Sequence, residues 1–255
     1  MKKLLTLYLW IVYCLLYIPI FIVIAFSFNN SKYTISWKGF TLKWYSELIG
    51  NTALIDATFH SITLATISAT CATILGTLTA LVLRRYSFWA NSILYGSIYA
   101  LTVVPDIVIG IAFLIFFISL RIELGFIPLV IAHTTLGLPF VTITVLTRLS
   151  NLSENLVEAA KDLGATEWQA IRLIILPLLI PSLIAGWFLS FTLSLDDILI
   201  SFFLATPEYD LLSLQIYSMV RLGVKPDINA LSSIMFLITV TFISLSQYFI
   251  TLRRK

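Results

Sequence analysis

Long apolar stretches, separated by short polar segments, dominate the pattern of hydrophobic and polar positions along this chain. Each stretch exceeds the length of about 20 helical residues that is needed to cross a hydrocarbon core. The stretches cover residues 4–28, 60–83, 92–120, 126–147, 178–204 and 229–252. The pattern therefore predicts an all-α fold, a polytopic membrane protein with six transmembrane helices in which residues 1–255 form one transmembrane domain.

Two stripes of small residues predict where these helices pack against one another. Each stripe repeats at every fourth position, and such faces let helix backbones approach closely within a lipid bilayer. The stripes are Ser68, Ala72, Gly76 and Ala80 on the second span, and Ser182, Gly186, Ser190 and Ser194 on the fifth. We also expect Pro105 and Pro139 to interrupt the third and fourth spans.

The composition agrees with a membrane protein. Hydrophobic residues make up 59% of the chain and charged residues only 11%, which excludes a soluble globular domain. Cys14 and Cys71 both lie in expected spans, where we interpret them as inert small hydrophobes. The apolar run after Lys2 and Lys3 is longer than the roughly 7–15 residues of a signal peptide, so we expect the first helix to be retained.

The distribution of basic residues predicts the orientation in the membrane. With a cytoplasmic N-terminus, 10 of the 16 Lys and Arg residues lie in cytoplasmic segments, and most of the others are dispersed through longer loops. Both termini and residues 148–177 are then expected in the cytoplasm. Residues 32–56, 121–125 and 205–227 are expected outside.

The cytoplasmic segment 148–177 is predicted to form two short amphipathic helices. Ser153 is placed to cap the first helix, and Gly164 can supply the left-handed residue that ends it. Thr166 and Gln169 have the spacing of a capping box for the second helix. The expected apolar stripe consists of Leu156, Val157, Ala160, Leu163, Ile171, Ile174 and Ile175. The alternative is an amphipathic helix that lies on the lipid surface.

Residues 158–177 read EAAKDLGATEWQAIRLIILP, which is similar to the ATPase-coupling loop of type I ATP-binding-cassette (ABC) importer permeases. That motif requires Glu-Ala-Ala, Gly after three further residues, and Ile-x-Leu-Pro after nine more. Its fixed positions fall on Glu158, Ala159, Ala160, Gly164, Ile174, Leu176 and Pro177. The resemblance implies that these residues, with the charged Asp162 and Glu167 between them, dock on an ATPase subunit.

Other segments resemble the permeases of polyamine importers within that family. They are LYIPI at 16–20, GFTLKWYSEL at 39–48, PDIV at 105–108, SFTLSLDDILIS at 190–201 and IYSMVRLGVKPDINAL at 216–231. The resemblance implies a type I ABC importer permease fold in the bacterial inner membrane and import of spermidine or putrescine. A permease of the same family for another cationic solute is the alternative.

The resemblance also implies the partners. They are a second homologous permease subunit, two ATPase subunits and a periplasmic polyamine-binding protein, with no nucleic acid among them. The chain itself is expected to be a transport subunit rather than an enzyme and to hold no cofactor, since ATP and Mg²⁺ would bind to the partner ATPase.

Three acids within apolar spans are candidates for the substrate pathway. A carboxylate at the bilayer centre costs about 2.5–3.5 kcal/mol, so we interpret Asp106, Asp196 and Asp197 as functional, with Ser194 in support. At about 1.5 Å per residue from positions 92 and 182, Asp106 and Asp196 both lie about 21 Å from the inner side. Their carboxylates fit the ammonium groups of a polyamine. The alternative makes Asp106 a helix cap and the other two a polar rim.

Aromatic residues in the expected outer loops are further candidates. Trp44, and Tyr209 beside Glu208, could receive cargo from a binding protein through cation–π and charge contacts. Interfacial anchoring is the alternative for Trp44 and Tyr209. His133, within the fourth span, is expected to be a packed and hydrogen-bonded core residue.

Two other classes of protein are less consistent with the sequence. A secondary transporter would carry an internal repeat and its own coupling-ion site, and it would have no use for an ATPase-docking loop. A membrane enzyme would need a catalytic constellation. The sequence contains no zinc-ligand spacing, nucleophile motif or phosphate-binding glycine loop.

Overall fold

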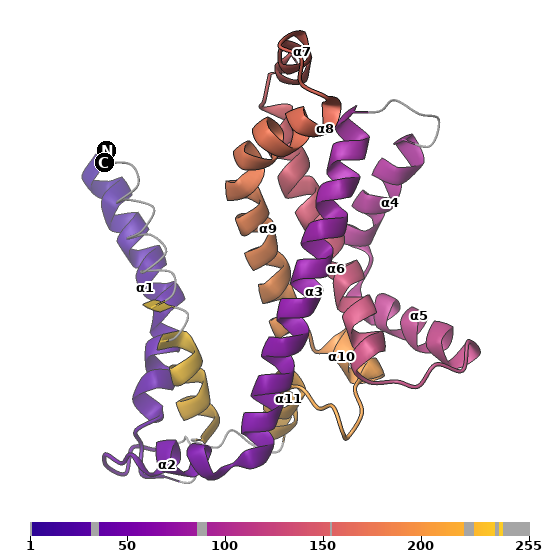
Figure 1. Cartoon of the computed structure of the whole chain (residues 1–255). Helices are drawn as coiled ribbons and strands as arrows, with labels where there is room; N and C mark the ends of the chain where they lie inside the picture. The colour runs from indigo at the N-terminus through magenta and orange to yellow at the C-terminus, as the bar shows by residue number, and fades with distance from the viewer. Residues whose placement is uncertain are drawn as a thin grey trace. The chain divides into compact units, whose positions relative to one another are not determined.

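The computed structural model describes residues 2–31, 36–85, 91–153, 155–221, 227–237 and 240–241, and these residues are predominantly helical. The helices, of which those named α are labelled in Figure 1, are α1 (Lys2–Phe26), α2 (Lys43–Gly50), α3 (Thr52–Arg85), α4 (Asn91–Val103), α5 (Asp106–Ser119), α6 (Phe126–Ser150), α7 (Leu156–Asp162), α8 (Glu167–Ala170), the π-helix η1 (Ile171–Ile175), α9 (Leu176–Asp196), α10 (Leu199–Leu204) and α11 (Leu212–Arg221). A further short apolar helix covers Asp227–Leu237. Within the described residues the only β structure is two isolated bridges, so the all-α fold class is confirmed.

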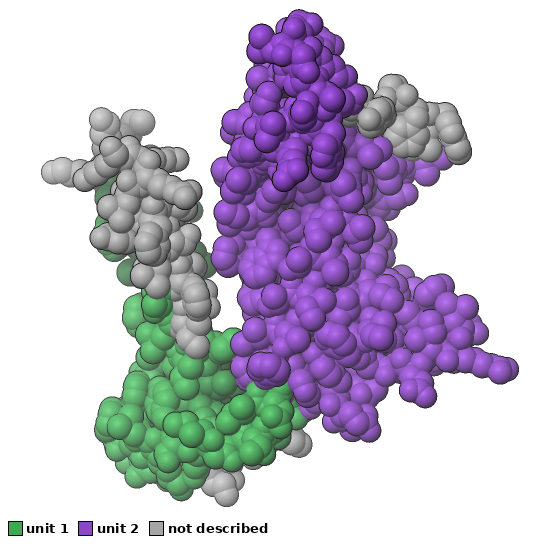
Figure 2. Space-filling model, viewed as in Figure 1, with its two compact units in different colours: residues 1–56, 215–255 green, residues 57–214 purple. Residues whose placement is uncertain are grey.

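The chain divides into two compact units, which Figure 2 shows in different colours. Unit 1 comprises residues 1–56 and 215–255, and unit 2 comprises residues 57–214. In unit 1, the ring of Phe28 lies 5.3 Å from the rings of both Phe40 and Tyr45. The Tyr45 hydroxyl also hydrogen-bonds to Ser27 at 2.7 Å. These contacts pack α2 against the segment that follows α1.

In unit 2, α6 packs between α3 and α9 through the two predicted small-residue stripes. All eight stripe residues are buried. Val141 of α6 lies against Gly76 of α3 on one side and against Gly186 of α9 on the other, so close to Gly76 that an added Cβ there would force Val141 to shift. The predicted packing faces are therefore confirmed, since small residues allow α6 to approach both neighbours.

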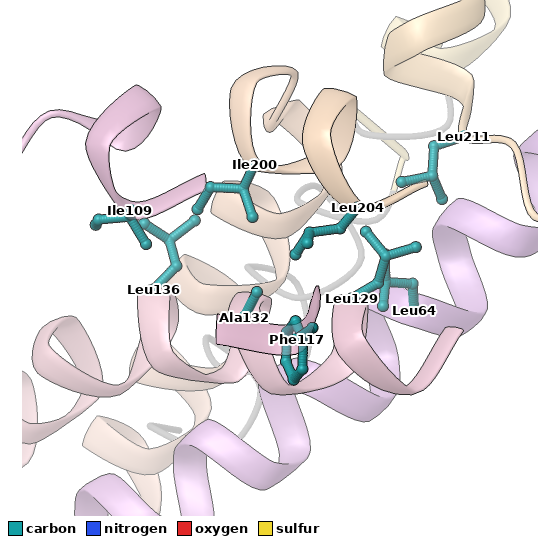
Figure 3. Close-up of a cluster of buried hydrophobic side chains, with 9 residues drawn as sticks. All are labelled: Leu64, Ile109, Phe117, Leu129, Ala132, Leu136, Ile200, Leu204 and Leu211. Atoms are coloured by element: carbon teal, nitrogen blue, oxygen red, sulfur yellow. The ribbon is translucent and has the colours of Figure 1, made fainter. Parts of the chain in front are cut away.

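A buried apolar cluster joins α3, α5, α6 and α10 near the end of α9 (Figure 3). Its nine side chains are Leu64, Ile109, Phe117, Leu129, Ala132, Leu136, Ile200, Leu204 and Leu211. The close packing of α5 on α10 depends on Gly110, because an added Cβ there would meet the Phe203 ring at 2.8 Å. This cluster supports the segments that carry Asp106 and Asp197.

The membrane spans do not fully match the predicted set of six. Among the described residues, four helices are long and apolar enough to cross a membrane, and α4 with α5 forms a fifth span only if the pair is counted as one. That pair bends by 111° at Pro105, as predicted, because Pro105 has no backbone N–H to donate and has an extended backbone, with φ −60° and ψ 136°. Most of the sixth predicted span, 229–252, lies outside the described residues.

Two other predictions about the spans are wrong. Helix α6 runs without interruption through Pro139, since a proline is tolerated inside a membrane helix when its neighbours satisfy the freed backbone group. The predicted span 178–204 is interrupted, because α9 ends at Asp196 and α10 begins at Leu199. Asp197 between them has an extended backbone, with φ −65° and ψ 128°.

Candidate functional site

The segment that matches the coupling-loop motif forms two short helices joined by a tight turn. Gly164 has a φ of +86°, in the left-handed region, as predicted. The Ala165 N–H donates to the Ala160 carbonyl at 3.0 Å, and the Gly164 N–H donates to the Lys161 carbonyl at 2.9 Å. These two bonds form a Schellman motif, which ends α7 and satisfies two of its last carbonyl groups.

The second helix begins with the predicted capping box. The Gln169 N–H donates to the Thr166 hydroxyl at 3.3 Å, and the Thr166 N–H donates to the Gln169 side chain at 2.7 Å. A salt bridge of 3.0 Å between Lys161 and Glu167 connects α7 to α8 across the turn. Local hydrogen bonds and this ion pair therefore fix the relative orientation of the two short helices.

Two details of the predicted loop are wrong. The N-cap of α7 is Asn155 rather than Ser153, and no side chain caps this helix. Leu163 was expected in the buried stripe, but its side chain is 90% exposed. Leu163 is the C-cap residue of α7, which lies at the outer end of unit 2, so its side chain remains in solvent.

The coupling segment is anchored to the membrane helices by apolar contacts. Leu156 and Val157 of α7 and Ile175 of η1 pack into a cluster with Leu149 of α6 and Leu179 of α9. Ala160 and Ala170 are buried as well.

The helices α7 and α8 lie at one end of unit 2 (Figure 1). Several of the residues expected to contact an ATPase are exposed there. They are Glu158, Ala159, Asp162, Gly164, Leu176 and Pro177, and the side chains of Leu163 and Trp168 are exposed beside them. Ile174 and Glu167 are half-buried.

Two of the three predicted membrane acids are exposed, and each adjoins an interruption in a helix. Asp106 is the first residue of α5, directly after the bend at Pro105. Asp196 is the last residue of α9. No described residue donates a hydrogen bond to either carboxylate. A carboxylate at a helix C-terminus adds to the negative end of the helix dipole, so Asp196 provides a strongly cation-attracting position.

Asp197, by contrast, is only 7% exposed and is fully hydrogen-bonded. Its Oδ1 accepts from the Ile200 N–H at 3.2 Å, and its Oδ2 accepts from the N–H and the hydroxyl of Ser201 at 2.7 and 2.8 Å. It therefore caps α10. Asp106 lies near enough to Asp197 for electrostatic repulsion between the two carboxylates.

Ser194 and His133 complete the buried cluster around Asp197. The His133 Nδ1 lies 2.7 Å from the Ser194 hydroxyl, and its Nε2 lies 3.2 Å from the Ser201 hydroxyl. His133 is thus the packed and hydrogen-bonded residue that was predicted. The link from His133 to Asp197 could not be predicted from the sequence, because the two residues are 64 positions apart and no local pattern connects them.

The aromatic candidates have their polar groups engaged in their own units. In unit 1, Trp44 donates its indole N–H to the Asn29 carbonyl at 2.8 Å. In unit 2, Tyr209 stacks on His60 at 4.2 Å and donates its hydroxyl to the His60 carbonyl at 3.0 Å. Burial raises the pKa of the Tyr209 phenol, so it remains a donor. The neighbouring Glu208 is exposed.

The described residues include no cluster of three or more His, Cys, Asp or Glu side chains that could hold a metal ion. The arrangement instead places the exposed residues of α7 and α8 toward one end of α9 and an exposed carboxylate, that of Asp196, at the other. With 21 residues at about 1.5 Å each, α9 separates the two by roughly 30 Å.

Comparisons with known proteins show the family and the fold of the chain. Residues 72–253 match the family model described as binding-protein-dependent transport system inner membrane component. The chain is 48% identical over 236 residues to the spermidine/putrescine transport system permease protein PotC of Escherichia coli K12, covering 92% of this chain and 89% of that one. It is 37% identical over 228 residues to the putrescine transport system permease protein PotI of the same strain, covering 86% and 80%.

Solved structures support the fold. A bacterial ABC transporter involved in the import of the acidic polysaccharide alginate contains a chain that superposes with a TM-score of 0.75, at 14% identity, and the match covers 97% of this chain and 96% of that one. At this identity the likeness bears on the fold alone. The family match and the extent of identity together show that the chain belongs to the inner membrane components of binding-protein-dependent transport systems, the permeases of type I ABC importers.

Proposed function

We propose that this chain is the permease subunit of an ABC importer that moves polyamines, spermidine or putrescine, into the cytoplasm. The observation that carries the proposal is the position of Asp106 and Asp196, two exposed carboxylates that each adjoin an interruption of an apolar helix. Interrupted helices and exposed acids within a membrane are features of transport pathways. The names of the relatives PotC and PotI support the choice of cargo.

The chemistry of a polyamine suits such a site. Its ammonium groups are spaced along a flexible apolar chain, and each can form a charge-assisted hydrogen bond with a carboxylate. Asp106 and Asp196 supply two such acceptors in unit 2. Glu208 with Tyr209, and Trp44, are proposed to receive the cargo from a periplasmic binding protein through charge and cation–π contacts.

The coupling loop supplies the second half of the mechanism. We propose that Glu158, Gly164 and the exposed Leu163 and Trp168 dock on a partner ATPase, which holds ATP and Mg²⁺ and carries out hydrolysis. The complex would contain two ATPases, a second homologous permease and a polyamine-binding protein. Because Leu156 and Ile175 pack against α6 and α9, a force on the loop is transmitted to α9 and so to Asp196.

Docking on an ATPase also implies how the chain is oriented in the membrane. We propose that both termini and the segment 148–177 are cytoplasmic, where ATP is available, and that residues 205–227 face the opposite compartment. The chain itself would act without a cofactor.

Reconstitution tests the proposed function directly. The complex of this chain with its partner subunits, placed in liposomes with ATP inside, should import labelled spermidine or putrescine when the binding protein is added outside. Uptake should stop without ATP and without the binding protein. If excess polyamine fails to compete with an unrelated organic cation that the complex imports, the cargo is that other cation and the polyamine proposal is wrong.

A further inference from the structure

The interruption between α9 and α10 is held by a buried polar cluster that draws on three helices. His133 of α6 is 1% exposed, and its ring lies between Ser194 of α9 and Ser201 of α10. Ser201 in turn bonds to Asp197. The cluster therefore connects the last turn of α9, the residues of the interruption and the first turn of α10 to one side chain of a neighbouring helix.

The directions of these hydrogen bonds can be assigned. Ser201 has one hydroxyl hydrogen, and it donates this hydrogen to the Asp197 carboxylate. The Ser201 oxygen must then accept from His133, which places a proton on Nε2. The Ser194 hydroxyl donates to Nδ1 of this tautomer. Both ring nitrogens and the carboxylate are satisfied, so the cluster needs no ligand to complete it.

The backbone at the interruption is also held by a residue outside the His133 cluster. The Ser213 hydroxyl donates to the Asp197 carbonyl at 2.7 Å. Asp197 thus has its carboxylate bound by α10 and its carbonyl bound by Ser213. Asp196, which directly precedes it, has an exposed side chain and no hydrogen-bond partner among the described residues. The position of this free carboxylate is set by its buried neighbour.

We infer that His133 is a positioning residue. Its hydrogen bonds to Ser194 and Ser201 hold α9 and α10 on either side of the interruption, and this places the Asp196 carboxylate on the substrate pathway. The inference rests on the proposed function for its meaning in transport, but its structural content is independent of the cargo. Within the cluster, Asp197 serves as a cap and connector, and Asp196 presents the free charge.

The first test measures the position of residue 196 without any cargo. Asp196→Cys is prepared in a chain that also carries Cys14→Ala and Cys71→Ala, and its rate of modification by a small cationic methanethiosulfonate is measured in the assembled complex. Adding His133→Leu should change this rate by about threefold or more, as expected when a buried hydrogen-bonded group loses its partners. The rate at an exposed loop control, Glu123→Cys, should stay the same.

The second test measures ATP-driven uptake in variants of the cluster. The side-chain nitrogen of Gln can occupy the place of Nε2 and keep the bond to Ser201, whereas Asn reaches only the place of Nδ1. His133→Gln should therefore keep uptake within about threefold, and His133→Asn and His133→Leu should lower it about tenfold. The control is Thr142→Val, which removes a buried hydroxyl that bonds only to its own helix, at Leu138. It should have little effect.

The outcomes separate the inference from the proposed function. An unchanged modification rate at position 196 in the His133→Leu variant overturns the inference, and so does an equal change at position 123, which would mean a general loss of structure. Equal uptake by the Gln and Leu variants also overturns it. If the modification rate changes as expected but the unmodified complex does not import polyamines, the positioning role stands and only the cargo is wrong.

Discussion

Ser190 of α9 lies so close to Gly137 of α6 that a Cβ added at position 137 would overlap its hydroxyl oxygen. The same Cβ would lie 3.3 Å from the Cβ of Ala72 on α3. Gly137 is therefore the point at which three helices meet with no space for a side chain. The contact between α6 and α9 depends on the absence of that side chain rather than on any strong bond.

Replacing this glycine should weaken the packing of unit 2. Gly137→Ala should lower the free energy of unfolding by about 1–3 kcal/mol, the usual cost of forcing extra atoms into a packed interior. Thermal unfolding of the purified chain in detergent measures the change. The control is Gly96→Ala in α4, where a Cβ would meet nothing within 4 Å and alanine favours the helix. Equal effects of the two substitutions would contradict this account of α6.

The turn at Gly164 should be essential for coupling to the ATPase. Gly164→Asp places a side chain on a left-handed residue, at a cost of roughly 1 kcal/mol or more, and adds bulk to the docking surface. We expect this change and Glu158→Ala to abolish uptake while the chain still inserts in the membrane. Radiolabelled polyamine uptake and the membrane content of the chain are the measurements.

Gly164→Asn removes the charge of the Asp variant but keeps its bulk. Asparagine, like aspartate, adopts the left-handed region more readily than most residues, so it retains the turn. If bulk is what prevents docking, this variant should also fail, with α7 and α8 still folded. Normal uptake by both Gly164→Asp and Glu158→Ala would remove the loop from the coupling role.

The three membrane acids should respond differently to substitution. Asp106→Asn and Asp196→Asn remove an exposed charge and should reduce uptake strongly, while Glu at either position should be milder because it keeps the charge. At Asp197 both Asn and Glu should be severe. Both oxygens of Asp197 accept backbone N–H groups, so an amide nitrogen would face a donor and a longer side chain would misplace the cap.

Initial rates of uptake, with binding-protein-stimulated ATP hydrolysis measured in parallel, test this pattern. Hydrolysis should survive at least in part in the Asn variants of Asp106 and Asp196, since the docking loop is unchanged. Normal import of spermidine by both variants would show that these carboxylates do not contact the cargo.

The proposed topology can be checked by labelling single cysteines with a membrane-impermeant reagent in intact cells and in inverted vesicles. Lys161→Cys should react only in inverted vesicles, because α7 is proposed to be cytoplasmic. Glu123→Cys and Glu208→Cys, both at exposed positions, should react in intact cells. Labelling of position 161 from outside would reverse the topology.

Local patterns in the sequence were sufficient to predict several features of unit 2. The stripe from Ser182 to Ser194 is buried along its whole length, and the capping box at Thr166 and the left-handed turn at Gly164 both form. Each depends on residues within a few positions of one another along the chain. Such features follow from helix geometry and from backbone preferences alone.

Features that depend on contacts between distant segments could not be predicted in this way. The pair Asp196 and Asp197 looked alike in the sequence, and only the approach of His133 distinguishes the buried cap from the free charge. Leu163 fits the apolar stripe in the sequence, but it is exposed at the end of α7. Ala160 proved to be buried, so crosslinks to an ATPase should be sought from position 163 rather than from 160.

The π-helix η1 has a consequence for building chimaeric permeases. A π-helical segment contains one residue more than an α-helix with the same number of turns requires, and each residue of an α-helix corresponds to a rotation of about 100°. Deleting one residue from Ile171–Ile175 would let α8 and α9 join as one regular helix and would rotate the docking surface about the axis of α9. The number of residues in this segment therefore sets the orientation of that surface. A coupling segment grafted from another permease must keep this number of residues, and keeping it matters more than keeping the individual side chains.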